Sequence, residues 1–308
     1  MSKKGNWTKD DIPSLERKII IVTGGNSGLG YESVKAFAEK GAQVIMTCRN
    51  IHKGEHARKH ILHHCKNAKI EVMQLDLMSL KSIHAFAAAF KSKYNQLHVL
   101  LNNAGIMRVP YKLTEDGIES QQATNHFGHF ALTGLLLETL KATSNARVVN
   151  VSSMAHRFGE MDFENLLYND GKDYSAWKAY GRSKLENLLF TFELQRFFEK
   201  NNLSASALAA HPGVSGTNLF SHIGGNKIQK ILRPFFDFFV QTPLMGALPQ
   251  IRASVDIHAH GGEYYGPDGR REMKGYPVIV KASELAQNKE IAAKLWKLSE
   301  EITTVKFT

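Results

Sequence analysis

The stretch IIIVTGGNSGLGYESVKAF, residues 19–37, indicates the fold class of this chain. It begins with four apolar residues, turns through glycines at positions 24, 25, 28 and 30, and ends in a segment whose apolar residues recur at helical spacing. An apolar strand, a glycine-rich turn and an amphipathic helix in succession form the first half of a βαβ unit. Repetition of this unit along the chain would produce a parallel sheet covered by helices.

The alternation of strand and helix does continue. Further strands are predicted at 42–48, 69–77, 97–105, 146–153, 203–213 and 261–266, and helices between them include long ones at 117–141 and 175–200 and a last one at 283–302. The strands are nearly continuously apolar, as parallel strands covered on both faces are. We therefore predict one α/β domain, 1–308: a doubly wound Rossmann fold with a central parallel sheet of about seven strands and an N-terminal arm at 1–16.

The glycines of the first turn predict a nucleotide site. In a doubly wound sheet, ligands bind at the carboxyl ends of the strands, where this turn lies. Gly24 would permit the tight turn, Gly28 would let a diphosphate approach the backbone, and Gly30 would let the helix pack closely against the strand. The N–H groups at the start of the helix would bind the phosphates. The alternative is a purely structural turn.

Charge and histidine content leave several partner classes open. The net charge of +10, from 39 basic and 29 acidic residues, favours anionic partners such as nucleotides, nucleic acid or acidic membranes. The basic residues are scattered and no nucleic-acid motif is present, so we expect no nucleic-acid partner. His63, His64 and Cys65 resemble a fragment of a metal site, but no second ligand group has suitable spacing, so a solvated helix face is the favoured interpretation.

The cysteine content and the distribution of apolar residues predict the cellular compartment. Two cysteines, Cys48 and Cys65, make no disulfide framework and favour a reducing, cytoplasmic location. The first residues contain no apolar segment of a secretory signal. The most apolar stretch, 231–251, is interrupted by Arg233, Pro234, Asp237 and Pro243, so stable membrane insertion is not expected. We expect a flexible lid or an interfacial helix there.

Six motifs occur in order along the chain: TGGNSGLG (23–30), NNAG (102–105), Asn125, SS (152–153), YGRSK (180–184) and HPGVSGT (211–217). With these motifs, residues 18–280 resemble the short-chain dehydrogenase/reductase family. The resemblance implies an oxidoreductase that moves a hydride between a nicotinamide cofactor and a small carbonyl or alcohol substrate.

The family pattern implies cofactor contacts from several loops at the carboxyl edge of the sheet. The residues concerned are Gly24, Asn26, Ser27, Gly28, Leu29, Gly30, Arg49, Asp76, Leu77, Asn103, Ala104, Gly105, Tyr180, Lys184, Pro212, Gly213, Val214 and Thr217. Asp76 resembles the adenine-contacting residue of the family, although an Asp at such a junction also commonly caps a helix.

The end of the second strand favours NADP(H) as the cofactor. An acid there would bind the ribose 2′-hydroxyl of NAD, but the position is Cys48. Arg49 follows, and its guanidinium can pair with a 2′-phosphate. The alternative is that Arg49 simply faces solvent.

Four residues form the predicted catalytic group: Asn125, Ser153, Tyr180 and Lys184. Tyr180 and Lys184 are four apart on a predicted helix and share a face. A nearby ammonium would lower the pKa of the Tyr180 hydroxyl and allow it to act as general acid or base. The resemblance implies that Lys184 also binds the nicotinamide ribose, and that Asn125 holds a water which relays protons.

Two serines, Ser152 and Ser153, follow the fifth strand. Alignment with the family pattern selects Ser153 to orient the substrate oxygen, with Ser152 as the alternative. Tyr180 lies 27 positions after Ser153, about twice the usual gap, and the extra segment resembles the retinol dehydrogenase and protochlorophyllide reductase-like branch. The retinol enzymes usually carry an N-terminal membrane anchor, which this sequence lacks, so a retinoid substrate is not the favoured expectation.

Residues 218–250 are predicted to form a substrate lid. This segment is rich in phenylalanine, with Phe220, Phe235, Phe236, Phe238 and Phe239, and predicts an apolar pocket for a hydrophobic substrate. Packing of a helix on the core is the alternative. The family also implies a possible homodimer through the helices at 117–141 and 175–200. A second function remains open: a catalytically inactive protein of the same fold that senses NADP(H).

Overall fold

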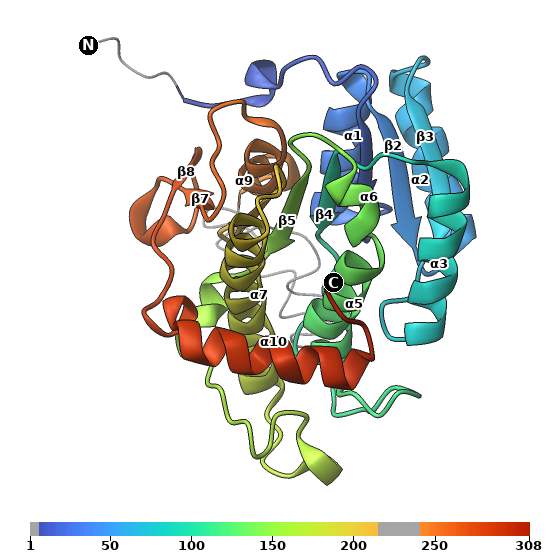
Figure 1. Ribbon diagram of the computed structural model, residues 1–308. Coiled ribbons are helices and arrows are strands. Elements are labelled where there is room, and N and C mark those ends of the chain that lie inside the picture. The colour runs from blue at the N-terminus through green and yellow to red at the C-terminus, as the bar shows by residue number, and fades with distance from the viewer. Residues whose placement is uncertain (1–5, 215–240) are drawn as a thin grey trace, which may run out of the picture.

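A computed structural model describes residues 6–214 and 241–308, and these form one eight-stranded sheet with helices on both faces (Figure 1). The strand order is β3-β2-β1-β4-β5-β6-β7-β8. In chain order the strands are β1 (Ile19–Val22), β2 (Gln43–Cys48), β3 (Lys69–Gln74), β4 (Val99–Asn102), β5 (Arg147–Val151), β6 (Ser206–Ala210), β7 (Tyr264–Pro267) and β8 (Pro277–Ile279). The doubly wound α/β fold predicted from the sequence is therefore confirmed.

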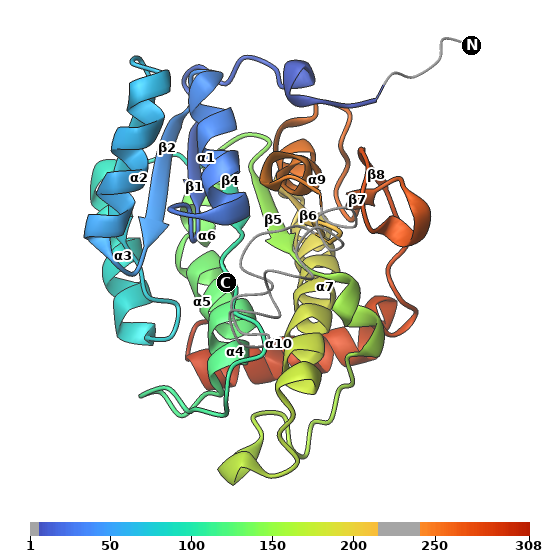
Figure 2. The same ribbon diagram turned by 180° about the vertical axis from the view of Figure 1, so that it is seen from behind.

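Helices surround the sheet. They are α1 (Gly28–Glu39), α2 (Ile51–His64), α3 (Leu80–Lys93), α4 (Ser120–Gln122), α5 (Gly128–Leu135), α6 (Leu137–Lys141), α7 (Ala176–Lys200), α9 (Pro243–Val255) and α10 (Lys289–Thr303). Helices α1, α2 and α9 pack on one face, and α3, α5 and α7 pack on the other (Figures 1 and 2).

The central strand β1 shows why its sequence is continuously apolar. Ile20 and Val22 belong to the core under α1 and α9, whereas Ile21 belongs to the core under α3, α5 and α7. All three are fully buried. In register, Ile21 lies between Ile45 of β2 and Leu100 of β4, both by parallel pairing. A strand buried on both faces between parallel neighbours has no polar face to show in its sequence.

The sheet has one strand more than predicted. The strand predicted at 261–266 is present as β7, but β8 follows and pairs with it antiparallel, with Tyr265 opposite Ile279. β8 has only three residues, and Ile279 at its end is 58% exposed. A segment so short has too little periodicity to be recognised in the sequence.

The helix predicted at 117–141 is broken. After α4, residues Ala123–Phe127 form a π-helix, which continues into α5 and then α6. π-helical turns insert one extra residue into a helix and are frequent at functional sites. The last helix, predicted from 283, begins as α10 at Lys289, where Asn288 caps it by accepting a hydrogen bond from the Ile291 N–H at 3.0 Å.

Part of the predicted lid belongs to the core. Residues 243–250 lie in α9, whose Ala247, Leu248 and Ile251 are at most 2% exposed and pack toward α1 and the sheet. For these residues, helix packing was the right alternative, because the buried apolar residues of α9 belong to the core that covers one face of the sheet. Residues 218–240 of the lid, including its five phenylalanines, lie outside the described residues, and so do residues 231–240 of the apolar stretch 231–251. In the predicted N-terminal arm, Ile12 and Leu15 are likewise buried in the core.

Helix α10 crosses the outer face of α5 and α7 (Figure 1). Its Trp296 packs against Phe190 of α7 and Phe130 of α5, with ring centroids 5.8 and 5.4 Å apart. Phe307 of the C-terminal tail completes this aromatic cluster. A homodimer through these two helices would therefore have to form over α10. Within residues 6–214 and 241–308, none of the helices combines the length and apolarity needed to cross a membrane.

Candidate active site

A cavity of about 310 Å³ opens at the carboxyl ends of β1, β2 and β4. Twelve of the predicted cofactor residues line it: Gly24, Asn26, Ser27, Gly28, Leu29, Gly30, Arg49, Asp76, Leu77, Asn103, Ala104 and Gly105. Pro212, Gly213 and Val214 lie on the loop after β6 and do not line this cavity. Thr217 falls outside the described residues.

The first turn has the geometry that its glycines require. Gly24 and Gly28 have φ values of +63° and +56°, in the left-handed region that favours glycine. A Cβ at Gly30 would lie 2.3 Å from the Gly24 carbonyl oxygen, so only glycine allows α1 to pack so closely against the turn. Ser27 is the N-cap of α1 but its side chain does not bond the helix, which leaves the first N–H groups facing the cavity for an anion.

Asn103 lines the cavity but its side chain is engaged within the protein. Its Nδ2 donates to the Thr23 carbonyl at 2.8 Å, and its Oδ1 accepts from Gln250 of α9 at 2.9 Å. The N–H groups of Asn103 and Ala104 both donate to the Thr23 hydroxyl at 2.9 Å. Asn103 thus ties the loop after β4 to the glycine turn and holds the two walls of the cavity together.

The residues at the ends of β2 and β3 face the outer part of the cavity. Cys48 is 4% exposed, and burial raises the pKa of its thiol. Arg49 is exposed at the cavity edge. The Asp76 carboxylate accepts from the Met78 N–H at 3.0 Å, whereas α3 is capped by Ser79, so the alternative of Asp76 as the cap of α3 is wrong.

Two lining residues were not anticipated from the sequence. Thr47 and Thr124 each have a buried hydroxyl for which the described residues supply no hydrogen-bond partner. Buried polar groups normally have partners, so two orphaned hydroxyls on one cavity fit a polar ligand there. Thr47 and Thr124 are the sequence neighbours of Cys48 and Asn125. This proximity to residues singled out in the sequence could have identified them as cavity-lining residues. The cavity therefore fits a dinucleotide: an open helix N-terminus, glycine-lined walls and two free hydroxyls.

Helix α7 carries Tyr180 and Lys184 on one face. The Lys184 Nζ lies 5.9 Å from the centroid of the Tyr180 ring and donates to the Val151 carbonyl at 2.9 Å. Lys184 is 4% exposed, and burial lowers its pKa to about 8. Burial raises the pKa of Tyr180, and a hydrogen bond with the Ser153 hydroxyl acts in the opposite direction. The expected net lowering of the Tyr180 pKa is therefore wrong for this structure, because desolvation of the phenolate outweighs its favourable contacts.

The two serines after β5 point to different partners. The Ser152 hydroxyl is buried and donates to the Lys184 carbonyl at 2.8 Å, which fixes α7 to the sheet. The Ser153 hydroxyl accepts from the Ala155 N–H at 3.2 Å and contacts the Tyr180 hydroxyl. Ser153, the residue selected from the sequence, is thus the serine that meets Tyr180.

Asn125 lies in the π-helix, and its side chain joins three elements. Its Oδ1 accepts from the Ile106 N–H at 2.9 Å, and its Nδ2 donates to the Ile106 carbonyl at 3.0 Å and the Ser183 hydroxyl at 2.8 Å. A Cβ at Gly105 would lie 3.1 Å from Asn125 Oδ1 and 3.3 Å from Lys184 Nζ. Glycine at 105, which lines the cavity, therefore allows the cavity wall to lie close to Asn125 and Lys184.

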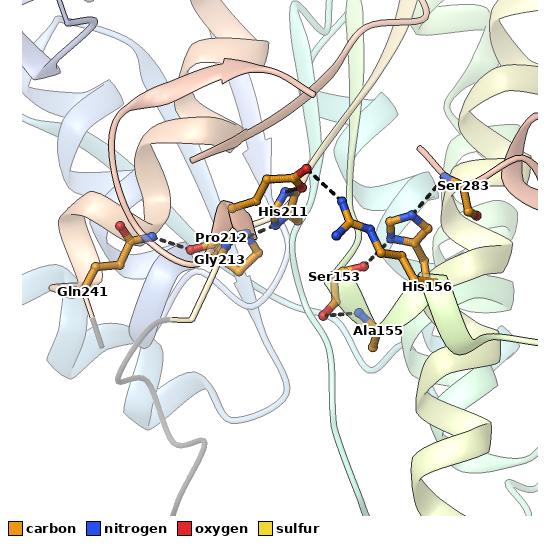
Figure 3. A network of polar contacts seen from close by, with 10 residues as sticks. Ser153, Ala155, His156, His211, Pro212, Gly213, Gln241 and Ser283 are labelled. Carbon is orange, nitrogen blue, oxygen red and sulfur yellow. Dashed lines mark hydrogen bonds and ion pairs between the residues drawn. The ribbon is translucent and has the colours of Figure 1, made fainter. Parts of the chain in front are cut away.

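The loop after β6 lies across from Ser153 (Figure 3). Gly213 has a φ of +65°, and the Pro212 carbonyl accepts a hydrogen bond from Gln241.

Among the described residues, no group of three His, Cys, Asp or Glu side chains is arranged to hold a metal ion. His63 and His64 end α2, and Cys65 is a free thiol.

Comparison with known proteins accords with this geometry. The family model of short chain dehydrogenases matches residues 18–226. Retinol dehydrogenase 12 of Homo sapiens is 38% identical over 95% of this chain and 88% of its own length, and retinol dehydrogenase 11 of Homo sapiens is 39% identical over 92% and 85%.

A crystal structure of an uncharacterized protein from Mycobacterium paratuberculosis is 40% identical, with a TM-score of 0.82 over 99% of this chain and all of that one. A complex of Pseudomonas aeruginosa RhlG with NADP shares the fold at 21% identity, with a TM-score of 0.65 over 82% of this chain and 94% of that one. Family motifs, sheet order and near full-length relatives agree. This chain therefore belongs to the short-chain dehydrogenase/reductase family, in its retinol dehydrogenase-like branch.

Proposed function

We propose that this oxidoreductase uses NADP(H) to interconvert the carbonyl and alcohol forms of an apolar substrate, with Tyr180 as general acid and base. The observation that carries the proposal is the meeting of Ser153, from the loop after β5, with Tyr180 and Lys184 of α7, beside a cavity lined by the glycine turn. A bound nicotinamide supplies or accepts the hydride.

Side chains of the protein orient the substrate oxygen and transfer its proton. The Ser153 hydroxyl donates a hydrogen bond to the carbonyl oxygen and orients it. During reduction the Tyr180 O–H bond breaks and its proton passes to that oxygen, so that the alcohol forms without a free alkoxide. The Lys184 ammonium, 5.9 Å from the ring centroid, then stabilises the phenolate. Oxidation of the alcohol runs the same steps in reverse.

The choice of NADP(H) rests on Arg49. It is exposed at the edge of the cavity, where its guanidinium can reach a 2′-phosphate, and the preceding residue is Cys48 rather than an acid. Two proteins of the same fold carry NADP in their structures, RhlG of Pseudomonas aeruginosa and a short chain dehydrogenase of Shigella flexneri.

The choice of an apolar substrate rests on two features. The relatives at 38–39% identity include retinol dehydrogenases, whose named substrate is an apolar alcohol. Trp177, 47% exposed, lies one turn before Tyr180 with ring centroids 6.5 Å apart, and it packs against Phe158, 50% exposed. Large exposed aromatic side chains beside a catalytic tyrosine offer an apolar surface to a substrate.

We also propose a cytoplasmic location for the protein, which the free thiols of Cys48 and Cys65 support.

The test is a screen of purified protein for NADPH oxidation over apolar aldehydes, ketones and quinones, followed by Tyr180→Phe on the best substrate. The variant keeps the ring but loses the acid, so turnover should fall by about 10²- to 10⁴-fold. NADPH binding should persist, since the glycine turn and Arg49 are untouched. Tyr276→Phe, a substitution of another tyrosine away from α7, is the matched control and should leave turnover unchanged. Near wild-type turnover in Tyr180→Phe would refute the mechanism, whereas NADPH binding without turnover on any compound would favour a sensing role.

A further inference from the structure

Two buried histidines flank the site, and the structure determines which ring nitrogen of each carries a proton. His156 Nε2 accepts from the Ser283 N–H at 3.2 Å, so Nδ1 must donate to the Ser153 carbonyl, 2.6 Å away. His211 Nδ1 accepts from the Gly213 N–H at 3.2 Å, so Nε2 is the donor of that ring. Each histidine thus braces a loop of the site: His156 the loop of Ser153, and His211 the loop after β6 (Figure 3).

One carboxylate connects these two loops. Glu272, in the segment between β7 and β8, accepts from His211 Nε2 at 3.1 Å through one oxygen and from Arg157 at 2.8 Å through the other. Arg157 follows His156 in the short helix after Ser153. The hydrogen bond from His211, with that from Arg157, keeps the pKa of Glu272 below its ordinary value. The carboxylate is therefore ionised at neutral pH and bridges two donors from opposite sides of the site.

The backbone that presents Glu272 is strained. Arg271 and Glu272 have φ values of +55° and +57°, in the left-handed region, although neither is glycine. Such backbone conformations are energetically unfavourable and persist only where surrounding contacts enforce them. Here the next residue provides one such contact, because the Met273 carbonyl accepts from the Val214 N–H at 2.7 Å.

The same segment presses on the loop after β6. A Cβ at Gly213 would lie 2.4 Å from the Met273 carbonyl oxygen, so the glycine is required for this approach. Tyr264 of β7 fills the space between the two histidines, with its ring centroid 5.7 Å from that of His156 and 5.2 Å from that of His211. The hydrogen bonds of Glu272 to His211 and Arg157, together with the packing of Tyr264, therefore restrict movement of the loop after β6 relative to the loop of Ser153.

We propose that Glu272 is a positioning residue: by bridging His211 and Arg157 it holds the loop at 211–214 at a set distance from Ser153, and so aligns the nicotinamide with the substrate oxygen. The proposal rests on the proposed function, because 211–214 is the loop expected to line the nicotinamide. Its role is alignment rather than contact, since Glu272 reaches the site only through His211 and Arg157.

The first test compares Glu272→Ala and Glu272→Gln with a matched control, Glu301→Gln, on the exposed side of α10. Measurements are kcat at saturating NADPH, the primary deuterium isotope effect with NADPH deuterated at the transferred position, the NADPH dissociation constant by fluorescence, and the thermal midpoint. Glu272→Ala should lower kcat about 10- to 100-fold and raise the isotope effect, because misalignment of about 1 Å slows the transfer itself. Glu272→Gln should be intermediate, since its amide oxygen still accepts from one donor. The control should match wild type.

Two results would overturn the proposal. One is a wild-type kcat and isotope effect in Glu272→Ala. The other is a fall in kcat that is matched by equal losses of NADPH affinity and thermal stability with an unchanged isotope effect, which would mark Glu272 as merely structural.

A second measurement does not depend on activity. Amide hydrogen exchange at Gly213 and Val214 should accelerate in Glu272→Ala, since their N–H groups bond to His211 and Met273. Unchanged exchange there would refute the bridge even if no substrate were found. Absence of turnover in wild type with accelerated exchange in the variant would instead refute the proposed function and leave the bridge intact.

Discussion

Replacing Lys184 by methionine should make the protein more stable at neutral pH while abolishing turnover. Lys184 is 4% exposed, and burial lowers the pKa of its ammonium from 10.5 to about 8. At pH 7 the group is charged in both the folded and the unfolded chain, so the folded state bears the cost of burying the charge. This lowering of the pKa corresponds to about 3 kcal/mol of free energy of unfolding.

Methionine removes this cost with little loss of contacts. The Lys184 hydrogen bond to the Val151 carbonyl disappears, for which about 1 kcal/mol is subtracted. That carbonyl still accepts from Asn187 Nδ2 at 3.0 Å, so no buried acceptor is orphaned. The net expectation for Lys184→Met at pH 7 is a gain of about 2 kcal/mol.

The sign of the pH dependence follows from the lowered pKa of a base. Below pH 8 the folded state carries the whole cost of the charge, and between pH 8 and 10.5 the folded lysine loses its proton and the cost is relieved. The stability advantage of Lys184→Met over wild type, about 2 kcal/mol at pH 7, should therefore largely disappear by pH 10.

Urea denaturation of wild type and Lys184→Met at pH 7 and pH 10 measures both quantities, with turnover assayed in parallel. Lys178→Met, an exposed lysine on the same helix, is the control and should change stability little at either pH. A Lys184→Met protein that is less stable than wild type at pH 7, or whose advantage is the same at both pH values, would refute the reasoning from burial.

Three further predictions concern the cofactor site and a second buried charge. Arg49→Ala should weaken NADPH binding by roughly 1.5–3 kcal/mol and leave NADH binding unchanged; equal wild-type affinities for the two cofactors in calorimetric titration would contradict this. Gly30→Ala places a Cβ 2.3 Å from the Gly24 carbonyl, so NADPH affinity and thermal stability should both fall, and a variant that binds NADPH normally would show that the turn can move. Burial raises the pKa of Glu186 to about 7, so stability falls as pH rises from 4.5 through 7; Glu186→Gln should therefore gain stability at pH 8 but not at pH 4, by urea denaturation.

The fold class, the family and most of the residues that line the cavity could be predicted from the amino-acid sequence alone. Those features depend on residues close together along the chain. The strand–turn–helix at 19–37 requires Gly24, Gly28 and Gly30 for local backbone reasons, and the spacing of Tyr180 and Lys184 places both on one helix face whatever surrounds them. Continuously apolar strands such as β1 likewise indicate burial on both faces of the sheet.

Features that depend on contacts between residues far apart in the chain could be recognised only in the folded structure. Residues 243–250, predicted as part of a lid, lie in the buried helix α9 and belong to the core. The helix predicted at 117–141 is interrupted by a π-helix. Desolvation raised the Tyr180 pKa where local spacing predicted a lower one, because burial is a property of the whole fold. The bridge from Glu272 to His211 and Arg157 joins residues 61 and 115 positions apart, and no periodicity or motif along the chain encodes a contact of that kind.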